Sequence, residues 1–216
     1  MASTCSPTIT LRRSKSDMRS GDIQYYVGVD LGKDRNHTAM AVLERKWYQA
    51  TTAEFIQSGG RGFQGEFRYR VVGMDRCALG TPYPVVIEWL KRHLSKYHPR
   101  VVTVVVDATG VGNPVMDFLR QANLGVSIIG TVIVPNMTGG GGTTLSGYRT
   151  ISRTELLTNL QIAVQARKFT IETKECRESQ ALSRELVLLR MEGKRPGVQD
   201  DLAFALALAV WWGLRP

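Results

Sequence analysis

The segment Val101-Val102-Thr103-Val104-Val105-Val106-Asp107 decides the fold class of this chain. Its first six residues are all β-branched, and an apolar run without alternation is typical of a strand that is buried on both faces. Residues 114–122 follow with helical periodicity, and residues 126–134 form a second apolar run. A strand, a helix and a strand in this order predict adjacent parallel strands at the centre of an α/β domain.

Shorter β-rich runs precede this unit. Residues 23–30 and 38–44 predict two strands, and one or two more are expected between residues 48 and 72. Their short connections indicate an antiparallel meander. The pattern as a whole predicts one α/β domain over residues 23–216, a mixed sheet with helices on both faces, after a polar tail of residues 1–22.

Apolar residues at helical spacing mark the other helices. They are expected over residues 81–94, from residue 152 onward, and over residues 179–190 and 200–212. Ser152-Arg153-Thr154-Glu155 is a capping box, so a helix should begin there. The spacing predicts that this helix buries Leu156, Leu160, Ala163 and Val164.

The chain of 216 residues has 28 Lys and Arg against 19 Asp and Glu, a formal net charge of +9. Such an excess favours an anionic partner, whether nucleic acid, a phosphorylated ligand or a membrane surface. The longest apolar run, residues 202–214, is shorter than a bilayer span of about 20 residues, and the N-terminus lacks the apolar core of a secretory signal. Three widely spaced cysteines do not predict a disulfide framework. We therefore expect a cytoplasmic protein with no membrane partner.

Aspartates interrupt the apolar runs at three places. Asp30 ends the first strand, Asp107 ends the buried strand, and Asp200 and Asp201 open the last helix. Such residues often cap turns and helices. Because a buried carboxylate without a partner is costly, carboxylates at two neighbouring strand ends favour a site for hard cations such as Mg²⁺ or Mn²⁺. A site of this kind can hold two ions for phosphodiester hydrolysis.

Other hydrolytic chemistries find little support in the sequence. His37, His93 and His98 stand in no zinc-binding motif, and the chain has no GxSxG element of a serine hydrolase. A P-loop that binds nucleoside triphosphates is also missing. The nearest match, residues 28–34, has the wrong spacing and ends in Asp34.

Several segments resemble the nuclease domain of phage large terminase subunits, a member of the RNase H-like superfamily. Together these segments extend the resemblance over almost the whole chain after the tail. They are VGVDLGKDRNHTAMAVL at 27–43, LGTPYPVVIEWL at 79–90, VVVDATGVGNPVMDFLR at 104–120, YRTISRTELLTNLQIAVQARKFTI at 148–171 and QDDLAFALALAVWW at 199–212.

The resemblance implies an RNase H-like mixed sheet and a two-metal endonuclease that cuts concatemeric DNA during genome packaging. Asp30 and Asp107 would be metal ligands and catalytic residues. The third ligand would come from the pair at 200–201, with Asp201 favoured and Asp200 as the alternative or a helper. Two Mg²⁺ or Mn²⁺ ions would activate the attacking water. The sequence departs from the family at Phe204, where many relatives have a further acid.

The resemblance also implies double-stranded DNA as partner, in the cytoplasm of a phage-infected or prophage-carrying cell. Cationic residues that flank the acidic positions in sequence are candidates for contacts with the DNA backbone, with a solvated surface as the alternative; they are Lys33, Arg35, Arg149 and Arg153. Because the chain lacks a P-loop, it would not be the packaging motor by itself. A separate ATPase motor, a small terminase subunit or a portal are open as partners.

Three alternatives remain. Gly110 and Gly112 follow a strand as in a dinucleotide-binding fingerprint, but Val115 replaces its third small residue and no acid follows the next strand. The first strand also resembles that of actin-like sugar kinases, which have two such domains and a longer chain. The third alternative is a non-catalytic DNA-binding module with a degenerate site.

Overall fold

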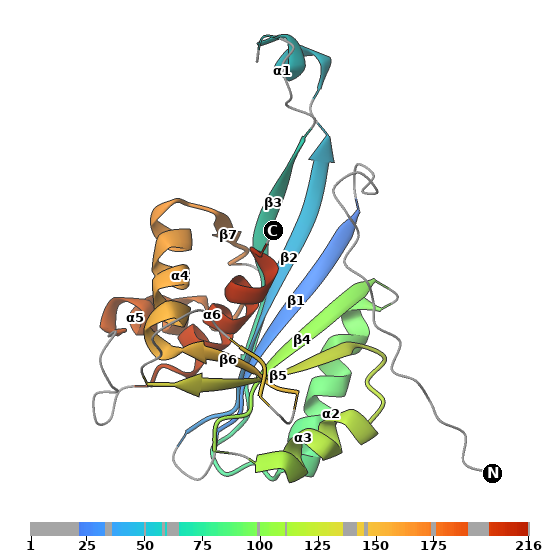
Figure 1. Cartoon of the computed structure of the whole chain (residues 1–216), viewed down its shortest axis with the longest axis vertical. Helices are drawn as coiled ribbons and strands as arrows, with labels where there is room; N and C mark the ends of the chain where they lie inside the picture. The colour runs from blue at the N-terminus through green and yellow to red at the C-terminus, as the bar shows by residue number, and fades with distance from the viewer. Residues whose placement is uncertain are drawn as a thin grey trace, which may run out of the picture.

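A seven-stranded mixed sheet forms the centre of this computed structural model (Figure 1). The strand order is β6-β5-β4-β1-β2-β3-β7. Pairs β1–β2 and β2–β3 are antiparallel, and the other neighbours are parallel. The residues that the structure describes are 22–32, 36–49, 51–57, 59, 65–98, 100–110, 112–135, 142–144, 147–173, 176–189 and 199–215.

The strands differ in length according to their place in the sheet. The long β2 and β3 form a hairpin that extends beyond the other strands in Figure 1, whereas the two edge strands are short. The strands are β1 Ile23–Asp30, β2 Ala39–Gln49, β3 Gly65–Arg76, β4 Val101–Asp107, β5 Ser127–Val134, β6 Arg149–Ser152 and β7 Phe169–Ile171.

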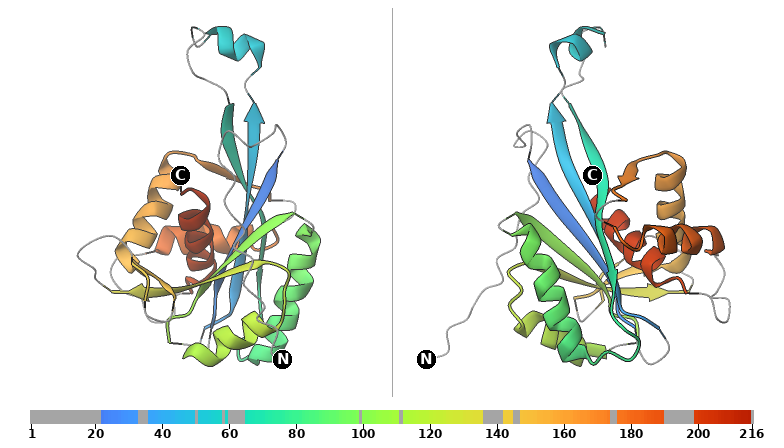
Figure 2. Two further views of the ribbon diagram at one scale, coloured as in Figure 1. Left: turned by 45° about the vertical axis from the view of Figure 1, so that its right-hand side comes forward. Right: turned by 180° about the vertical axis from the view of Figure 1, so that it is seen from behind.

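Helices cover both faces of the sheet. Helices α4, α5 and α6 lie on one face, and α2 and α3 lie on the other (Figures 1 and 2), while α1 sits at the tip of the β2–β3 hairpin. Their bounds are α1 Thr52–Gln57, α2 Tyr83–Leu94, α3 Gly112–Gln121, α4 Arg153–Gln165, α5 Ser179–Leu188 and α6 Asp201–Gly213, with a 3₁₀ turn η2 at Ser95–Tyr97.

Each face of the sheet has its own hydrophobic core. The core under α4, α5 and α6, here the α6-side core, includes Tyr26 and Val105. The core under α2 and α3, here the α2-side core, includes Val29 and Val106. Helix α6 is apolar on all sides and almost entirely buried, as expected of a helix packed between a sheet and other helices.

The predicted α/β architecture is confirmed, with a mixed sheet and helices on both faces. Strand β1 has the bounds that the sequence indicates, and the capping box is present because Ser152 Oγ accepts the Glu155 N–H at 3.0 Å. The buried face of α4 differs from the prediction at one position, since Val164 is exposed and Leu157 is buried instead. The predicted tail of residues 1–22 lies outside the described residues, apart from Asp22.

Three short elements depart from the prediction. Helix α1 lies between the second and third strands, where the sequence predicts only strands and a loop, so β3 begins at Gly65. Strands β6 and β7 have 4 and 3 residues, too few to show a pattern of their own. Within the described ranges, no helix is both long and apolar enough to cross a bilayer.

Candidate functional site

The last residues of β1 and β4 are both aspartates, and the parallel register places Asp30 directly opposite Asp107. Alternate side chains of a strand point to opposite faces of the sheet. Because Val29 and Val106 belong to the α2-side core, the two aspartates lie on the side of α6. Adjacent strands are about 4.8 Å apart, so these carboxylates can reach a shared ligand.

Asp107 is oriented by the loop that follows its own strand. The backbone N–H of Thr109 donates to Asp107 Oδ1 at 2.8 Å. Thr109 is fixed in turn, since its Oγ1 accepts the N–H of Ile133 on β5 at 2.8 Å. Burial raises the pKa of the Asp107 carboxyl, and the hydrogen bonds from Thr109 oppose that rise. No cationic side chain in the described part of the chain forms an ion pair with Asp107.

Helix α6 brings the third predicted ligand to the same edge of the sheet. Gly28 of β1 leaves room for the α6 backbone, because a Cβ there would lie 1.8 Å from the Ala205 carbonyl oxygen. At its other end α6 packs Gly213 against Tyr26 of β1. The helix therefore runs antiparallel to β1. Asp201 lies one turn before Ala205, and its helix thus begins at the end of β1 that carries Asp30.

Asp200 and Asp201 occupy different environments at the start of α6. Asp201 is the first residue of the helix and is only 1% exposed. Asp200 takes the N-cap position without a capping hydrogen bond to the described helix, and its Oδ2 lies 3.5 Å from Arg153 Nη2. The Arg153 guanidinium also stacks on Phe204 at 4.3 Å from the ring centroid. Phe204 thus holds the partner of Asp200 at the position where the resemblance implies a further acid.

Glu185 is a buried acid that sequence reasoning missed. It lies on α5, is 5% exposed, and accepts the N–H of Ala203 at 2.9 Å. Burial raises the pKa of its carboxyl, and nearby Asp201 raises it further, whereas Ala203 and Arg76 lower it. One signal in the sequence points to it: Glu185 stands three residues after buried Leu182, on the apolar face of its helix.

Arg76 at the end of β3 balances this buried charge. Its Nη1 lies 3.1 Å from Glu185 Oε1 and its Nη2 lies 3.0 Å from Glu178 Oε2. Arg76 also donates to Gln199 Oε1 at 3.0 Å, just before the acidic pair. The β3 end, α5 and the start of α6 are therefore joined through one guanidinium group.

The predicted cationic residues do not form one group. Arg153 is directed into the interior by Asp200, and its side chain is 21% exposed. Arg149 is exposed on β6 and donates to Thr143 Oγ1 at 2.8 Å. Lys33 and Arg35 lie outside the described residues. Of this set, Arg149 remains as a described cation on the surface.

Comparison with solved structures places this arrangement among known folds. The crystal structure of the large terminase nuclease from thermophilic phage G20c is similar with a TM-score of 0.55 and 17% sequence identity, over 90% of this chain and 84% of that chain. The chain has an RNase H-like fold. No protein-family model matches it, and no curated protein sequence does so. In this RNase H-like fold, the candidate site is the edge where β1, β4 and the start of α6 meet.

The donor chemistry at this edge fits Mg²⁺ or Mn²⁺. Asp30, Asp107 and Asp201 offer only carboxylate oxygens, which hard divalent cations prefer. Burial raises the pKa of the Asp107 carboxyl, which accepts a hydrogen bond from the neutral backbone of Thr109. The described side chains do not form a closed ligand cluster, since no three His, Cys, Asp or Glu among them stand within reach of one ion.

Proposed function

We propose that this protein is a metal-dependent DNA endonuclease of the kind found in phage large terminases. The observation that carries the proposal is the direct pairing of Asp30 with Asp107 at the end of two parallel strands, on the face of α6. The similarity in fold to a terminase nuclease supports it. The net charge of +9 suits a polyanionic substrate such as double-stranded DNA.

In this proposal Asp30, Asp107 and Asp201 hold two divalent cations, Mg²⁺ or Mn²⁺. Bound cations of this kind supply an activated water and stabilise the leaving oxygen of a phosphodiester. The chain itself positions the ligands: Thr109 orients Asp107, and the packing of α6 on Gly28 sets the position of Asp201. Asp200 serves as a helper that fixes the start of α6 through Arg153.

Cleavage of supercoiled plasmid tests the proposal. We expect nicked and linear products with Mg²⁺ or Mn²⁺ and none in chelator. Asp107→Asn should abolish cleavage, whereas Asp117→Asn on the exposed side of α3 should cleave like the wild type, since Asp117 pairs with Arg120 away from the site. Both variants are checked for folding by circular dichroism. Equal cleavage by the Asp107 variant would refute the assignment.

A non-catalytic DNA-binding module is the second candidate. The absence of a closed three-ligand cluster among the described residues favours it. This candidate predicts that the wild type binds DNA in chelator and that neither Mg²⁺ nor Mn²⁺ produces a cut. Calorimetric titration of Mn²⁺ separates the two candidates independently of activity, because only the nuclease should bind the ion in a manner that Asp107→Asn removes.

The terminase hypothesis extends to partners. A separate ATPase motor, a small terminase subunit or a portal would deliver DNA to the nuclease. Co-purification of the chain with each such component tests this extension, and the nuclease assignment does not depend on its result.

A further inference from the structure

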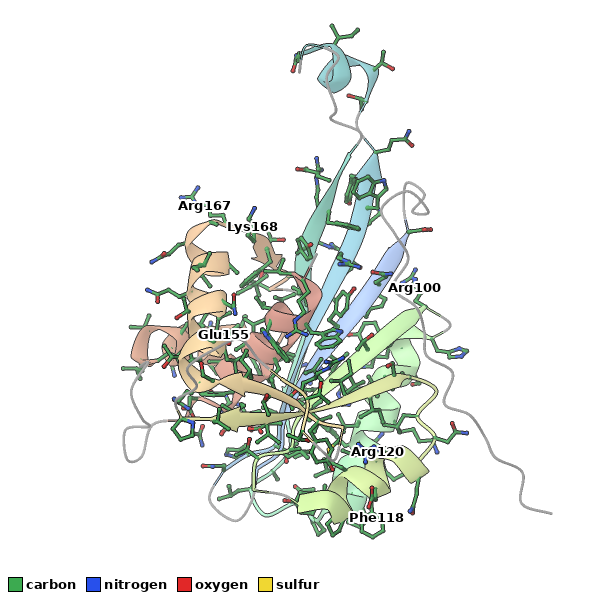
Figure 3. All side chains as sticks on the ribbon, in the orientation of Figure 1. Arg100, Phe118, Arg120, Glu155, Arg167 and Lys168 are labelled. Atoms are coloured by element: carbon green, nitrogen blue, oxygen red, sulfur yellow. The ribbon has the colours of Figure 1, made fainter. Side chains whose placement is uncertain are left out.

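A groove of ≈ 660 Å³ lies at the opposite end of the sheet from the aspartates. It runs between the outer half of the β2–β3 hairpin and the turn that leads from α4 to β7. Figure 3 shows Arg167 and Lys168 at this turn, at the end of α4. Its lining combines cationic and aromatic side chains: Lys46, Arg68, Arg70, Arg167 and Lys168, with Trp47, Tyr48, Phe67, Tyr69 and Phe169.

The sheet register separates the groove from the candidate active site. Lys46 pairs with Arg68 inside the groove, whereas Ala39, at the other end of β2, pairs with Asp30. Lys46 lies seven positions after Ala39, which is about 23 Å at the rise of a β-strand. The groove is therefore a second surface, separate from the aspartates but on the same strands.

The charge of the groove is positive. Five cationic side chains line it against two carboxylates, Glu44 and Glu66. Glu66 pairs with Arg68 at 2.9 Å, and Glu44 pairs with Arg70 at 3.0 Å. The other three cations, Lys46, Arg167 and Lys168, form no ion pair with a carboxylate among the residues described. Their charge is available to an external anion.

Aromatic rings hold some of these cations in place. The Arg68 guanidinium lies 4.5 Å from the centroid of the Tyr48 ring, and Lys46 Nζ lies 5.0 Å from the same centroid. Trp47 and Phe67, at alternate positions of the same two strands, pack edge to face with ring centroids 4.8 Å apart. Positive grooves interleaved with aromatic side chains are the pattern of surfaces that follow a nucleic-acid strand.

Arg167 occupies a backbone conformation that costs free energy. Its φ is +49°, in the left-handed region that favours glycine. The turn is well defined, since Arg167 N–H donates to the Val164 carbonyl at 3.0 Å and Lys168 N–H donates to the Ala163 carbonyl at 2.9 Å. Glycine would relieve this strain, yet the position carries an exposed cation at the wall of the groove.

We infer that this groove binds the phosphodiester backbone of a nucleic acid, as a docking surface remote from the site of cleavage. The choice of nucleic acid as the ligand of the groove rests on the proposed function. The phosphates are contacted by Lys46, Arg167 and Lys168. The aromatic rings keep neighbouring cations oriented toward the nucleic-acid strand.

Fluorescence anisotropy with labelled duplex and single-stranded DNA tests the inference in chelator, where cleavage cannot occur. The double variant Arg167→Gly, Lys168→Gln removes two groove cations, and its glycine suits the positive φ, so folding should be retained. The matched control is Lys91→Gln, Arg92→Gln, which removes two exposed cations from α2 that do not line the groove.

For duplex DNA, removing one phosphate-binding cation should lower the slope of log K against log salt by about 0.9, which raises Kd roughly eightfold at about 0.1 M salt. The groove variant removes two such cations, so we expect its slope to fall by about 1.8 and its Kd to rise roughly sixtyfold, with wild-type binding for the α2 control. Equal affinity and equal slope in the groove variant overturn the inference. Displacement of the DNA by poly-glutamate at equal charge concentration also overturns it, since the groove would then bind any polyanion.

The outcomes distinguish this inference from the proposed function. If the wild type cleaves plasmid and the groove variant binds DNA normally, the groove assignment falls and the nuclease assignment stands. If the groove variant loses binding and the wild type never cleaves with Mg²⁺ or Mn²⁺, the groove assignment stands and the nuclease assignment falls.

Discussion

The contact between β1 and α6 predicts that Gly28→Ala destabilises the protein. A Cβ at Gly28 would lie 1.8 Å from the Ala205 carbonyl oxygen and 2.8 Å from the Ala209 nitrogen. Ordinary contact begins at 3.4 Å, so the helix must retreat by about 1.6 Å. Both obstructing atoms belong to the backbone, and no change of side-chain rotamer relieves the clash.

Two opposing effects set the magnitude of this penalty. Overpacking a close-packed core costs about 1–3 kcal/mol. Alanine regains about 0.5–1 kcal/mol over glycine in a strand. Because α6 is buried along its whole length and packs against α4 and α5 as well as the sheet, the retreat disturbs packing on several sides, and the upper part of the overpacking range applies. We expect a net loss of about 2 kcal/mol.

Urea denaturation measures this loss as a lower midpoint at an unchanged slope. The control is Gly142→Ala, where a Cβ would lie 3.5 Å from Thr150 Oγ1, an ordinary contact. Its stability should stay within about 0.5 kcal/mol of the wild type. A wild-type midpoint for Gly28→Ala would refute the reasoning, because the helix would then not rest on Gly28.

Three further predictions concern buried charge and pH. Arg76→Gln should lower the free energy of unfolding in urea by about 3–5 kcal/mol, because it leaves the Glu185 carboxylate buried without its cation. The double variant with Glu185→Gln should recover most of this loss. A small loss in the single variant would contradict the role of Arg76. Asp107→Asn should raise the urea midpoint of unfolding at neutral pH. Burial raises the pKa of the Asp107 carboxyl, and a neutral amide avoids the cost of burying the ionised form. A lower midpoint would contradict this reasoning. Burial raises the pKa of Cys77 from 9.0 to about 11, so the unfolded chain releases this proton first and stability falls as pH rises through that window. The fall should be smaller in Cys77→Ser when both proteins are unfolded in urea at pH values below and above the window, and equal falls exclude the thiol as its cause.

The sequence indicated the central strands because their pattern is local and strong. β1 and β4 are long apolar runs, and each is recognisable without its neighbours. β7 has three residues and exists through its pairing with β3, which lies about 100 positions earlier in the chain. Pairing between distant segments leaves no periodic trace, so β7 could not be predicted.

The candidate site shows the same division between local and distant information. Asp30, Asp107 and Asp201 mark the ends of elements, and such positions can be read from the apolar runs beside them. Arg153 looked like a surface cation, yet Asp200 and Phe204 hold it. Its partners are set by how α4 meets α6, which depends on packing and not on the residues next to Arg153.

The acids around α6 divide into two groups by the source of their balancing charge. Glu185 and Asp200 face guanidinium groups of the chain itself, from Arg76 and Arg153. Such pairs fix the start of the helix, whose positive end also favours carboxylates. Asp107 has neutral donors from Thr109 and no cationic partner among the described side chains. In the proposed nuclease, a bound divalent cation would supply the counter-charge that Asp107 lacks among the described residues. The first group therefore builds the site, and Asp107 is the residue at which a bound metal should change stability most.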